Sequence, residues 1–385
     1  MKLLFLIYFL FFIRFGMVLP FVPLYAKHLG ADPISIGLVV GSFSFFSFLM
    51  AFPAGIFSDR LGPKLVLLIS TIMNILYSTL LLLSKNLWIL TSAQLIGGLG
   101  FLFMLVGSQV YISSQEDKRV IEKSFGWAAF SAALGQSIGP FLGGILFSKF
   151  SFEGMFKFAI LTAIGELLVL ALKDITPKET YSLSFKSVIS VLKEILNSHV
   201  VAVFLFSFIV LFVTSLRNSF LPILLKEKSL TEKEIGFLIS IFAIGMTLIR
   251  LFIGRIFGSV SRLILVIITL SLITVATGVI PLINSKFIFS IPILMIGFGF
   301  GIFQPLSVVM VSDFVPKGYL GLSFGMRFSI ITFASIIGPS VFGLLAQRWG
   351  VASSFYAASL SMIIVGSIIV ALLKRPKPSS GIGPQ

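Results

Sequence analysis

The sequence predicts an all-α membrane protein in which twelve transmembrane helices form two pseudo-symmetric six-helix bundles. The first observation is composition: the 385 residues are 57% hydrophobic and 11% charged, with a mean hydropathy of +1.10. A soluble protein of this length needs more charge to cover its surface. The second is an internal repeat at an offset of 199 residues, which aligns Gly37 with Gly236 and Gly139-Pro140 with Gly338-Pro339 without a gap. Duplicated apolar halves suit alternating access, in which one bundle rocks against the other.

Each predicted helix is an apolar stretch of about 20 residues, the length that crosses a bilayer at about 1.5 Å rise per residue. The first bundle takes residues 1–172, with helices over 3–26, 34–57, 64–84, 87–112, 123–148 and 154–172. The second takes residues 199–373, with helices over 199–223, 234–257, 262–282, 287–311, 318–346 and 351–373. The first stretch follows Lys2 but is too long for a secretory signal and contains Arg14, so we expect it to be retained.

Two polar segments lie outside the bundles. Residues 173–198 form the predicted cytoplasmic linker, which contains Pro177 and four lysines. Within it, residues 187–196 have the apolar spacing of a helix and are expected to lie on the inner membrane surface. Residues 374–385 form a basic, proline-rich cytoplasmic tail that is expected to be disordered.

The net charge of +15 follows the positive-inside rule and does not indicate nucleic-acid binding. More of the 29 Lys and Arg residues lie in segments on the side of both termini than on the other side. Both termini are therefore predicted to be cytoplasmic, in a multi-pass protein of the inner cell membrane. The chain has no cysteine, only two histidines and no phosphate-cradling loop. We expect no metal, no cofactor and no catalytic residue, and a monomer that is not an enzyme.

The loop after the second predicted helix reads Gly55-Ile56-Phe57-Ser58-Asp59-Arg60-Leu61-Gly62-Pro63-Lys64. Gly62 permits a tight turn, Asp59 can face the positive end of a helix dipole, and the basic residues can pair with carboxylates. This pattern resembles the signature loop of the major facilitator superfamily, whose plan is twelve helices in a six-plus-six repeat. The resemblance implies a gating latch between the two bundles, formed by Asp59, Arg60, Gly62 and Lys64. A solvated basic turn is the alternative.

The fifth predicted helix carries Gly135, Gly139 and Gly143 on one face, with Pro140 beside them. Glycines at this spacing let another helix approach closely, and a proline frees a backbone carbonyl and can kink the helix. The run resembles a motif of the drug–proton antiporters within the superfamily, which implies a gating role for these four residues. Packing alone is the alternative. Exporters of that branch usually have an arginine where Gln94 stands, and this departure counts against proton coupling of their kind.

Arginines interrupt the helices at places where the other half has apolar residues. Arg14 lies near the middle of the first helix, Arg217 lies in the seventh, and Arg327 lies about 14 Å into the eleventh. A charge inside a bilayer costs about 2.5–3.5 kcal/mol and needs a cavity or a partner. Arg14 and Arg217 lie on helices that line the central path in this family, and paired arginines there resemble the organophosphate–phosphate exchangers, which implies that they grip an anionic substrate. Arg327, Gln136 and Gln304 are the further candidates for substrate binding. Pairing with buried polar groups is the alternative.

Glu166 is the one carboxylate that falls deep in a predicted span. Its helix, the sixth, is usually peripheral in the family that the loop indicates. Glu166 is the candidate for carrying a coupled proton, and a structural partner or a neutral acid near lipid is the alternative. The lack of acids in the first, fourth and seventh helices argues against a site for cationic drugs.

These patterns predict a secondary transporter that works by alternating access and moves a small anionic or neutral amphipathic molecule across the lipid bilayer. The motifs are exporter-like, and coupling to protons or another ion is expected. Two alternatives stay open at this point. One is an organic-anion or organophosphate exchanger, and the other is a non-transporting sensor or lipid-handling protein on the same scaffold.

Overall fold

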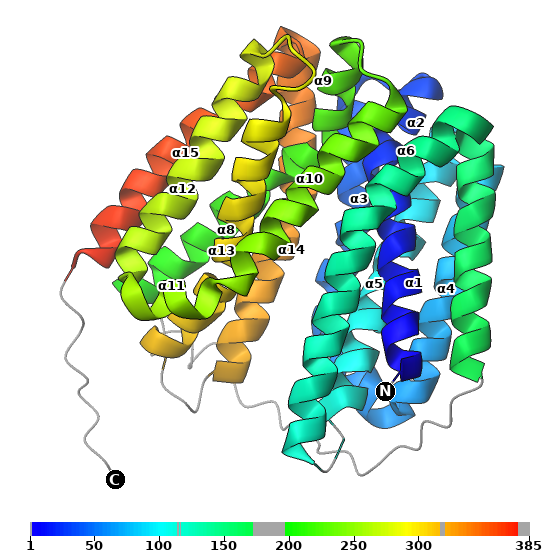
Figure 1. Ribbon diagram of the computed structural model, residues 1–385, viewed down its shortest axis with the longest axis horizontal. Coiled ribbons are helices and arrows are strands. Elements are labelled where there is room, and N and C mark those ends of the chain that lie inside the picture. The colour runs from blue at the N-terminus through cyan, green and yellow to red at the C-terminus, as the bar shows by residue number, and fades with distance from the viewer. Residues whose placement is uncertain (1, 114, 116, 172–196, 316–319, 376–385) are drawn as a thin grey trace.

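The computed structural model describes residues 2–113, 115, 117–171, 197–315 and 320–375, which form helices joined by short turns and contain no strand. Figure 1 shows two helical bundles side by side, the first coloured blue to green and the second green to red. Eleven described segments are long and apolar enough to cross a membrane, and one of them, Arg119–Ala171, has 53 residues. That segment holds two spans, so the predicted twelve-helix fold is confirmed.

The first bundle is built from seven helical elements. They are α1 (Lys2–Val18), η1 (Leu19–Phe21), α2 (Val22–His28), α3 (Pro33–Leu61), α4 (Pro63–Leu83), α5 (Leu87–Ser113) and α6 (Lys118–Ala171). The first three form one broken span, interrupted at Pro20 and Pro23 because proline lacks the N–H that continues a helix. Within α6, Ser151 has φ 58° and ψ −170°. The chain reverses there, as the sequence predicted between residues 148 and 154.

The second bundle repeats this plan. Its elements are α8 (Ser198–Ser219), α9 (Leu221–Glu227), α10 (Glu232–Leu251), α11 (Ile253–Ser259), α12 (Arg262–Val279), η2 (Ile280–Leu282), α13 (Ser290–Phe314), α14 (Leu320–Trp349) and α15 (Val351–Leu373). Asn197 caps α8 by accepting hydrogen bonds from the backbone N–H groups of His199 and Val200. Residues 172–196 and 376–385 lie outside the described residues, so the predicted linker and tail stay predictions, as do the domain boundaries beside them.

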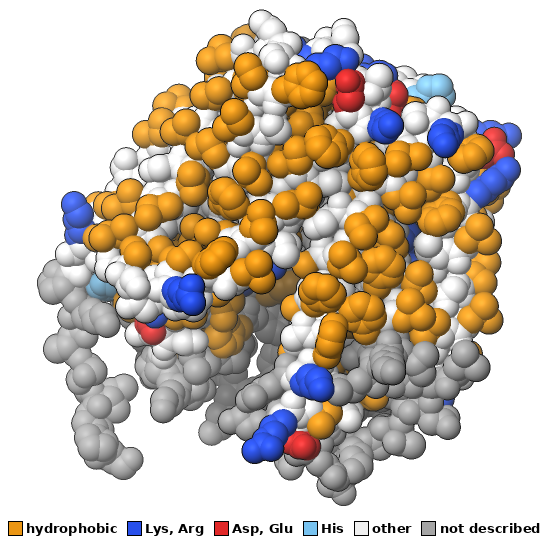
Figure 2. Space-filling view, in the orientation of Figure 1, with side chains coloured by type: hydrophobic (Ala, Val, Ile, Leu, Met, Phe, Trp, Pro, Cys, Tyr) orange, Lys and Arg blue, Asp and Glu red, His pale blue; other side chains and the backbone are white. Residues whose placement is uncertain are grey.

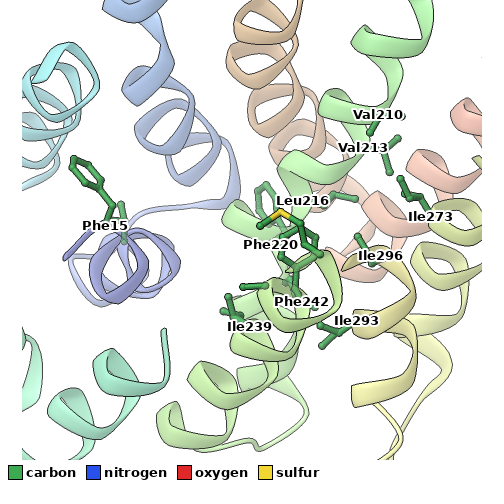
Figure 3. Packing of buried hydrophobic residues seen from close by; sticks show 14 of the residues in the cluster. Phe15, Val210, Val213, Leu216, Phe220, Ile239, Phe242, Ile273, Ile293 and Ile296 are labelled. Carbon is green, nitrogen blue, oxygen red and sulfur yellow. The ribbon is translucent and has the colours of Figure 1, made fainter. Parts of the chain in front are cut away.

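Apolar side chains cover the outside of the bundles and also fill their cores. In Figure 2 the hydrophobic side chains form a broad band, and the charged side chains gather toward the two ends of the molecule. Inside the second bundle, Val213 and Leu216 of α8 lie near Phe242 of α10 and Ile296 of α13 in a buried cluster (Figure 3). An apolar surface over an apolar core is what a bilayer requires of a multi-helix protein.

The two bundles touch most closely on the side that carries α2 and α9, which we call the far side; the opposite side, where α1 begins and α15 ends, is the terminal side (Figure 1). A Cβ at Gly37 of α3 would lie 2.3 Å from the carbonyl oxygen of Pro339 of α14. The repeat-related Gly236 of α10 would meet the carbonyl oxygen of Pro140 of α6 at 2.2 Å. The aligned glycines and prolines of the repeat therefore form the same contact twice, once between α3 and α14 and once between α10 and α6.

A second pair of contacts extends this interface by one turn. A Cβ at Gly144 would lie 2.5 Å from the carbonyl oxygen of Glu232, and a Cβ at Gly343 would lie 2.5 Å from that of Pro33. Beside the contact of Gly236, the backbone N–H of Phe141 donates to Ser240 Oγ across the bundles at 3.1 Å. Four glycines thus bring helix backbones together and keep the far side closed.

Candidate functional site

The centre of the first bundle holds a buried ion pair. Arg14 Nη1 of α1 donates to Glu166 Oε2 of α6 at 2.9 Å, and both side chains are 0% exposed. Thr71 Oγ1 of α4 lies 2.9 Å from Glu166 Oε1. Three helices therefore meet at one carboxylate, which offsets the charge of Arg14 inside the bundle.

Aromatic rings surround the guanidinium of this pair. Its central carbon lies 5.4 Å from the ring centroids of both Phe11 and Phe15, a distance at which a cation is attracted to a ring face. Phe15 in turn stacks on Tyr77 of α4, with 5.6 Å between the ring centroids and 8° between the planes. Among the described residues, Arg14 Nε and Nη2 and Tyr77 Oη have no hydrogen-bond partner.

Arg327 lies in the second bundle in a different setting. Its Nε and Nη2 donate to Ser307 Oγ of α13 at 3.1 and 2.5 Å, and its guanidinium carbon lies 5.7 Å from the ring centroid of Phe303. Its side chain is 8% exposed. In the described part of the chain it forms no ion pair with a carboxylate, so its charge is held by a hydroxyl and a ring alone.

Arg217 occupies the last turn of α8. Its guanidinium carbon lies 3.9 Å from the ring centroid of Phe242 of α10, and its Nε has no partner among the described atoms. Like Arg327, it forms no ion pair with a described carboxylate. Arg217 and Arg327 of the second bundle therefore carry positive charges that no described acid neutralises, and the half-buried Arg250 of α10 likewise forms no ion pair with a described carboxylate.

A cavity of about 280 Å³ opens between the bundles on the terminal side. It is lined by Leu102, Leu105, Val106 and Gln109 of α5 and by Phe324, Gly325 and Phe328 of α14. The lining is apolar apart from one amide, and Arg327 lies on α14 between the two lining phenylalanines, Phe324 and Phe328. This arrangement can accept the apolar part of an amphipathic molecule.

The sequence singled out Arg14 and Glu166 for separate roles, and the structure brings them together. It places Arg217 and Arg327 in the other bundle. Gln136 and Gln304 are half-buried and show no hydrogen bond to any of these arginines. Their part in substrate binding, and that of the three arginines, stays a prediction.

The glycines of the fifth span pack inside the first bundle. A Cβ at Gly135 would lie 2.7 Å from the backbone nitrogen of Ile13 of α1, one at Gly139 2.7 Å from the Ile13 carbonyl oxygen, and one at Gly143 2.4 Å from that of Met17. These contacts show that α6 packs closely against α1. A gating role for the three glycines and Pro140 stays a prediction.

The predicted latch loop has the expected backbone. Gly62 has φ 78° and ψ 152° and separates α3 from α4, so a residue with a side chain is disfavoured there. Lys64 is half-buried on the first turn of α4. The side chains of Asp59 and Arg60 lie outside what the structure describes, so the latch itself stays a prediction.

Comparison with known proteins assigns the chain to a family. The family model of the Major Facilitator Superfamily matches residues 4–217 and, a second time, residues 203–384. The chain belongs to the major facilitator superfamily. The two matches cover the two halves separately, in agreement with the internal repeat and with the twelve-helix fold.

Relatives and solved structures extend this assignment. An uncharacterized MFS-type transporter of Methanocaldococcus jannaschii is 24% identical over 376 residues, 94% of each chain. Quinolone resistance protein NorA of Staphylococcus aureus is 26% identical over 188 residues, 48% of each chain. The nucleoside transporter NupG has a TM-score of 0.85 at 15% identity, over 97% of this chain and 99% of its own. The human organic anion transporter MFSD10 has a TM-score of 0.68 at 19% identity, over 96% and 98%.

Sequence reasoning missed the residues that complete the two arginine sites. Thr71, Tyr77 and Ser307 are common residues in apolar helices, and none carries a charge to draw attention. One signal was available, because Ser70, Thr71 and Asn74 place three polar side chains within five residues of α4 and all are 0% exposed. A polar stripe of this kind on a spanning helix indicates a face turned toward the protein.

Proposed function

We propose that this member of the superfamily is a secondary transporter that moves a small amphipathic anion, or a neutral molecule of similar shape, by alternating access. The observation that carries the proposal is the contrast between the bundles. Arg14 is neutralised by Glu166 at 2.9 Å, while Arg217 and Arg327 have no ion pair with a described carboxylate. The guanidinium of Arg327, on the part of α14 that lines the apolar cavity, favours a ligand with an anionic group and an apolar body.

The closed far side and the cavity on the terminal side support a cycle between two states. With both termini in the cytoplasm, as the charge distribution indicates, the cavity faces inward. Export is the direction we propose, because the fifth-span motif and the partial match to NorA both belong to exporters. We further propose a monomer of the cell membrane that needs no cofactor and that is coupled to protons or another ion.

The orientation can be checked directly. Reporter domains fused after Lys178 and after Gln385 should both read cytoplasmic, because the positive charges concentrate on the side of both termini. A third fusion in the short turn after Leu83 serves as the matched control and should read external. An external reading at Gln385 together with a cytoplasmic one after Leu83 would reverse the assignment.

Arg327→Gln tests the anion site. In proteoliposomes, uptake of a panel of anionic, zwitterionic and cationic amphiphiles should show preference for anions, and the variant should bind the best anion about ten- to hundredfold more weakly. That range corresponds to the loss of about 1.5–3 kcal/mol from a charged hydrogen bond. Arg348→Gln, an exposed arginine near the end of the same helix, is the control and should bind normally.

The same assay separates the alternatives. If no member of the panel moves and none stabilises the purified protein against heat, the transport proposal is wrong and a sensor or lipid-handling role replaces it. If anions move only when an anion is also present on the opposite side, the protein is an exchanger. Equal uptake by wild type and Arg327→Gln would remove Arg327 from the site.

A further inference from the structure

We propose that Glu166 is a proton-binding site, and that Phe101 links its proton occupancy to the cavity between α5 and α14. The place of this site in a transport cycle rests on the proposed function, whereas the site itself is argued from contacts within the first bundle. Of the carboxylates in the described ranges, Glu166 is the one that is fully buried. Glu166 lies on the sixth span. Gln94 of the fourth span is an uncharged amide, so it supplies no acidic or basic group to this site.

The first step of the argument concerns the hydroxyl of Thr71. Its Oγ1 lies 2.9 Å from Glu166 Oε1 and also 2.9 Å from the carbonyl oxygen of Leu67. A hydroxyl has one hydrogen, so it cannot donate to both acceptors. If Glu166 is charged, Thr71 donates to the carboxylate. If Glu166 is protonated at Oε1, its own O–H donates to Thr71 Oγ1, and Thr71 donates to Leu67.

The geometry therefore satisfies both protonation states of Glu166 without moving a side chain. Protonation adds one hydrogen to Oε1 from the solvent and reverses the direction of one hydrogen bond. Thr71 would also serve a fixed counter-ion by donating to its second oxygen, so a measurement of the protonation state decides between the two roles. Thr71 acts as a positioning residue for the proton.

The second step concerns Arg14. Among the described residues, Arg14 of α1 is the ionisable group that contacts Glu166, and Tyr77 of α4 stacks on Phe15, one of the rings beside that arginine. When Glu166 takes up a proton, Arg14 loses its counter-charge inside a closed bundle. Its Nε and Nη2 already lack partners, so the guanidinium is then held mainly by the rings of Phe11 and Phe15.

The third step connects these rings to the cavity. Phe101 of α5 lies 5.4 Å from Phe11 and 5.2 Å from Phe15, measured between ring centroids. The next residue, Leu102, and Leu105 one turn further both line the cavity. A molecule in the cavity presses on the turn of α5 that carries Phe101, and Phe101 touches the rings that flank Arg14. The contacts therefore connect a ligand in the cavity, through Phe101 and the rings beside Arg14, to the carboxylate of Glu166. The hydrogen bond between Thr71 and Glu166 has two directions, one for each protonation state.

Infrared difference spectroscopy tests the proton site without any ligand. Spectra of the full chain in lipid, recorded in acidic and alkaline buffer, should contain the high-frequency carbonyl band of a carboxyl group shielded from water. Glu166→Gln should lose this band, and Glu153→Gln, at an exposed glutamate of the same helix, should keep it. Glu166→Asp should shift the band, so the assignment does not depend on one variant.

Phe101→Ala tests the link. The pH at which the Glu166 band is half-developed should shift in this variant, because the packing around Arg14 is lost. Phe46→Ala is the control: Phe46 is half-buried like Phe101 and its ring contact is with Phe45, so the midpoint should stay as in wild type. The absence of the band from wild type, or its persistence in Glu166→Gln, overturns the proton site. An unchanged midpoint in Phe101→Ala, or an equal shift in the control, overturns the link.

These outcomes are independent of the anion experiments. A protein that transports no anion but shows the band refutes the proposed function and leaves the proton site in place. A protein that transports anions without the band keeps the proposed function and refutes this inference.

Discussion

Replacing Glu166 with leucine should destabilise the protein by about 3–5 kcal/mol, the usual effect of removing one partner from a buried ion pair. The guanidinium of Arg14 would then be left 0% exposed in the first bundle with no described carboxylate to offset its charge. The measurement is the midpoint of thermal unfolding of the purified protein in detergent, with wild type as reference.

The double variant Arg14→Leu, Glu166→Leu is the matched control for this result. It removes both charges and fills their volume with apolar atoms, so its stability should return close to that of wild type. A double variant as unstable as Glu166→Leu would mean that packing rather than charge governs the site. A single variant as stable as wild type would show that Arg14 finds another partner.

Gly236→Leu should abolish transport, because its Cβ would lie 2.2 Å from the carbonyl oxygen of Pro140 and would force the bundles apart on the far side. The far side then cannot close, and the protein is trapped in the opposite state. Since the chain has no cysteine, a single cysteine at Ser240, a residue that is 4% exposed, can report the opening. Reagents that cannot cross the membrane should label it from the far side faster in Gly236→Leu than in the otherwise wild-type chain, which opens there only for part of its cycle.

Gly254→Leu is the control for this prediction. An added Cβ there meets no atom within 4 Å, so transport and labelling should match wild type. Loss of transport in both variants would indicate a general intolerance of leucine at glycine positions. Normal transport by Gly236→Leu would show that the contact with Pro140 is not needed for closure.

Hydropathy and the repeat were enough to predict the fold. The spans follow from runs of apolar residues longer than a bilayer is thick, and those signals are local. The break at Ser151 was predicted to within a few residues because the chain there becomes polar between two apolar runs. The division of the first span into α1, η1 and α2 was not predicted, although Pro20 and Pro23 were visible, because prolines are also tolerated inside spanning helices.

The candidate site was predicted only in part. The cost of burying charge marked Arg14 and Glu166 as special, but they are 152 residues apart. Their pairing depends on how α1 and α6 are rotated about their own axes, which hydropathy does not fix when helices are apolar on every side. The glycine spacing of the fifth span likewise predicted a close approach without naming the helix that approaches. Gly139 faces α1, whereas the carbonyl oxygen of its neighbour Pro140 lies against Gly236 of α10.

The interface on the far side has the form of a two-fold dimer contact. Gly37 meets Pro339 as Gly236 meets Pro140, so each half offers the other the same patch, which is the rule for an isologous interface. A chain of only one half could therefore make this contact with a second copy of itself. The glycines and prolines that keep the two halves in register are the ones that such a six-helix dimer would need, whereas Arg14, Glu166 and Arg327 have no counterparts across the repeat. Joining two halves in one chain frees those positions to differ, so that the two bundles hold their buried arginines in different settings on either side of one symmetric interface.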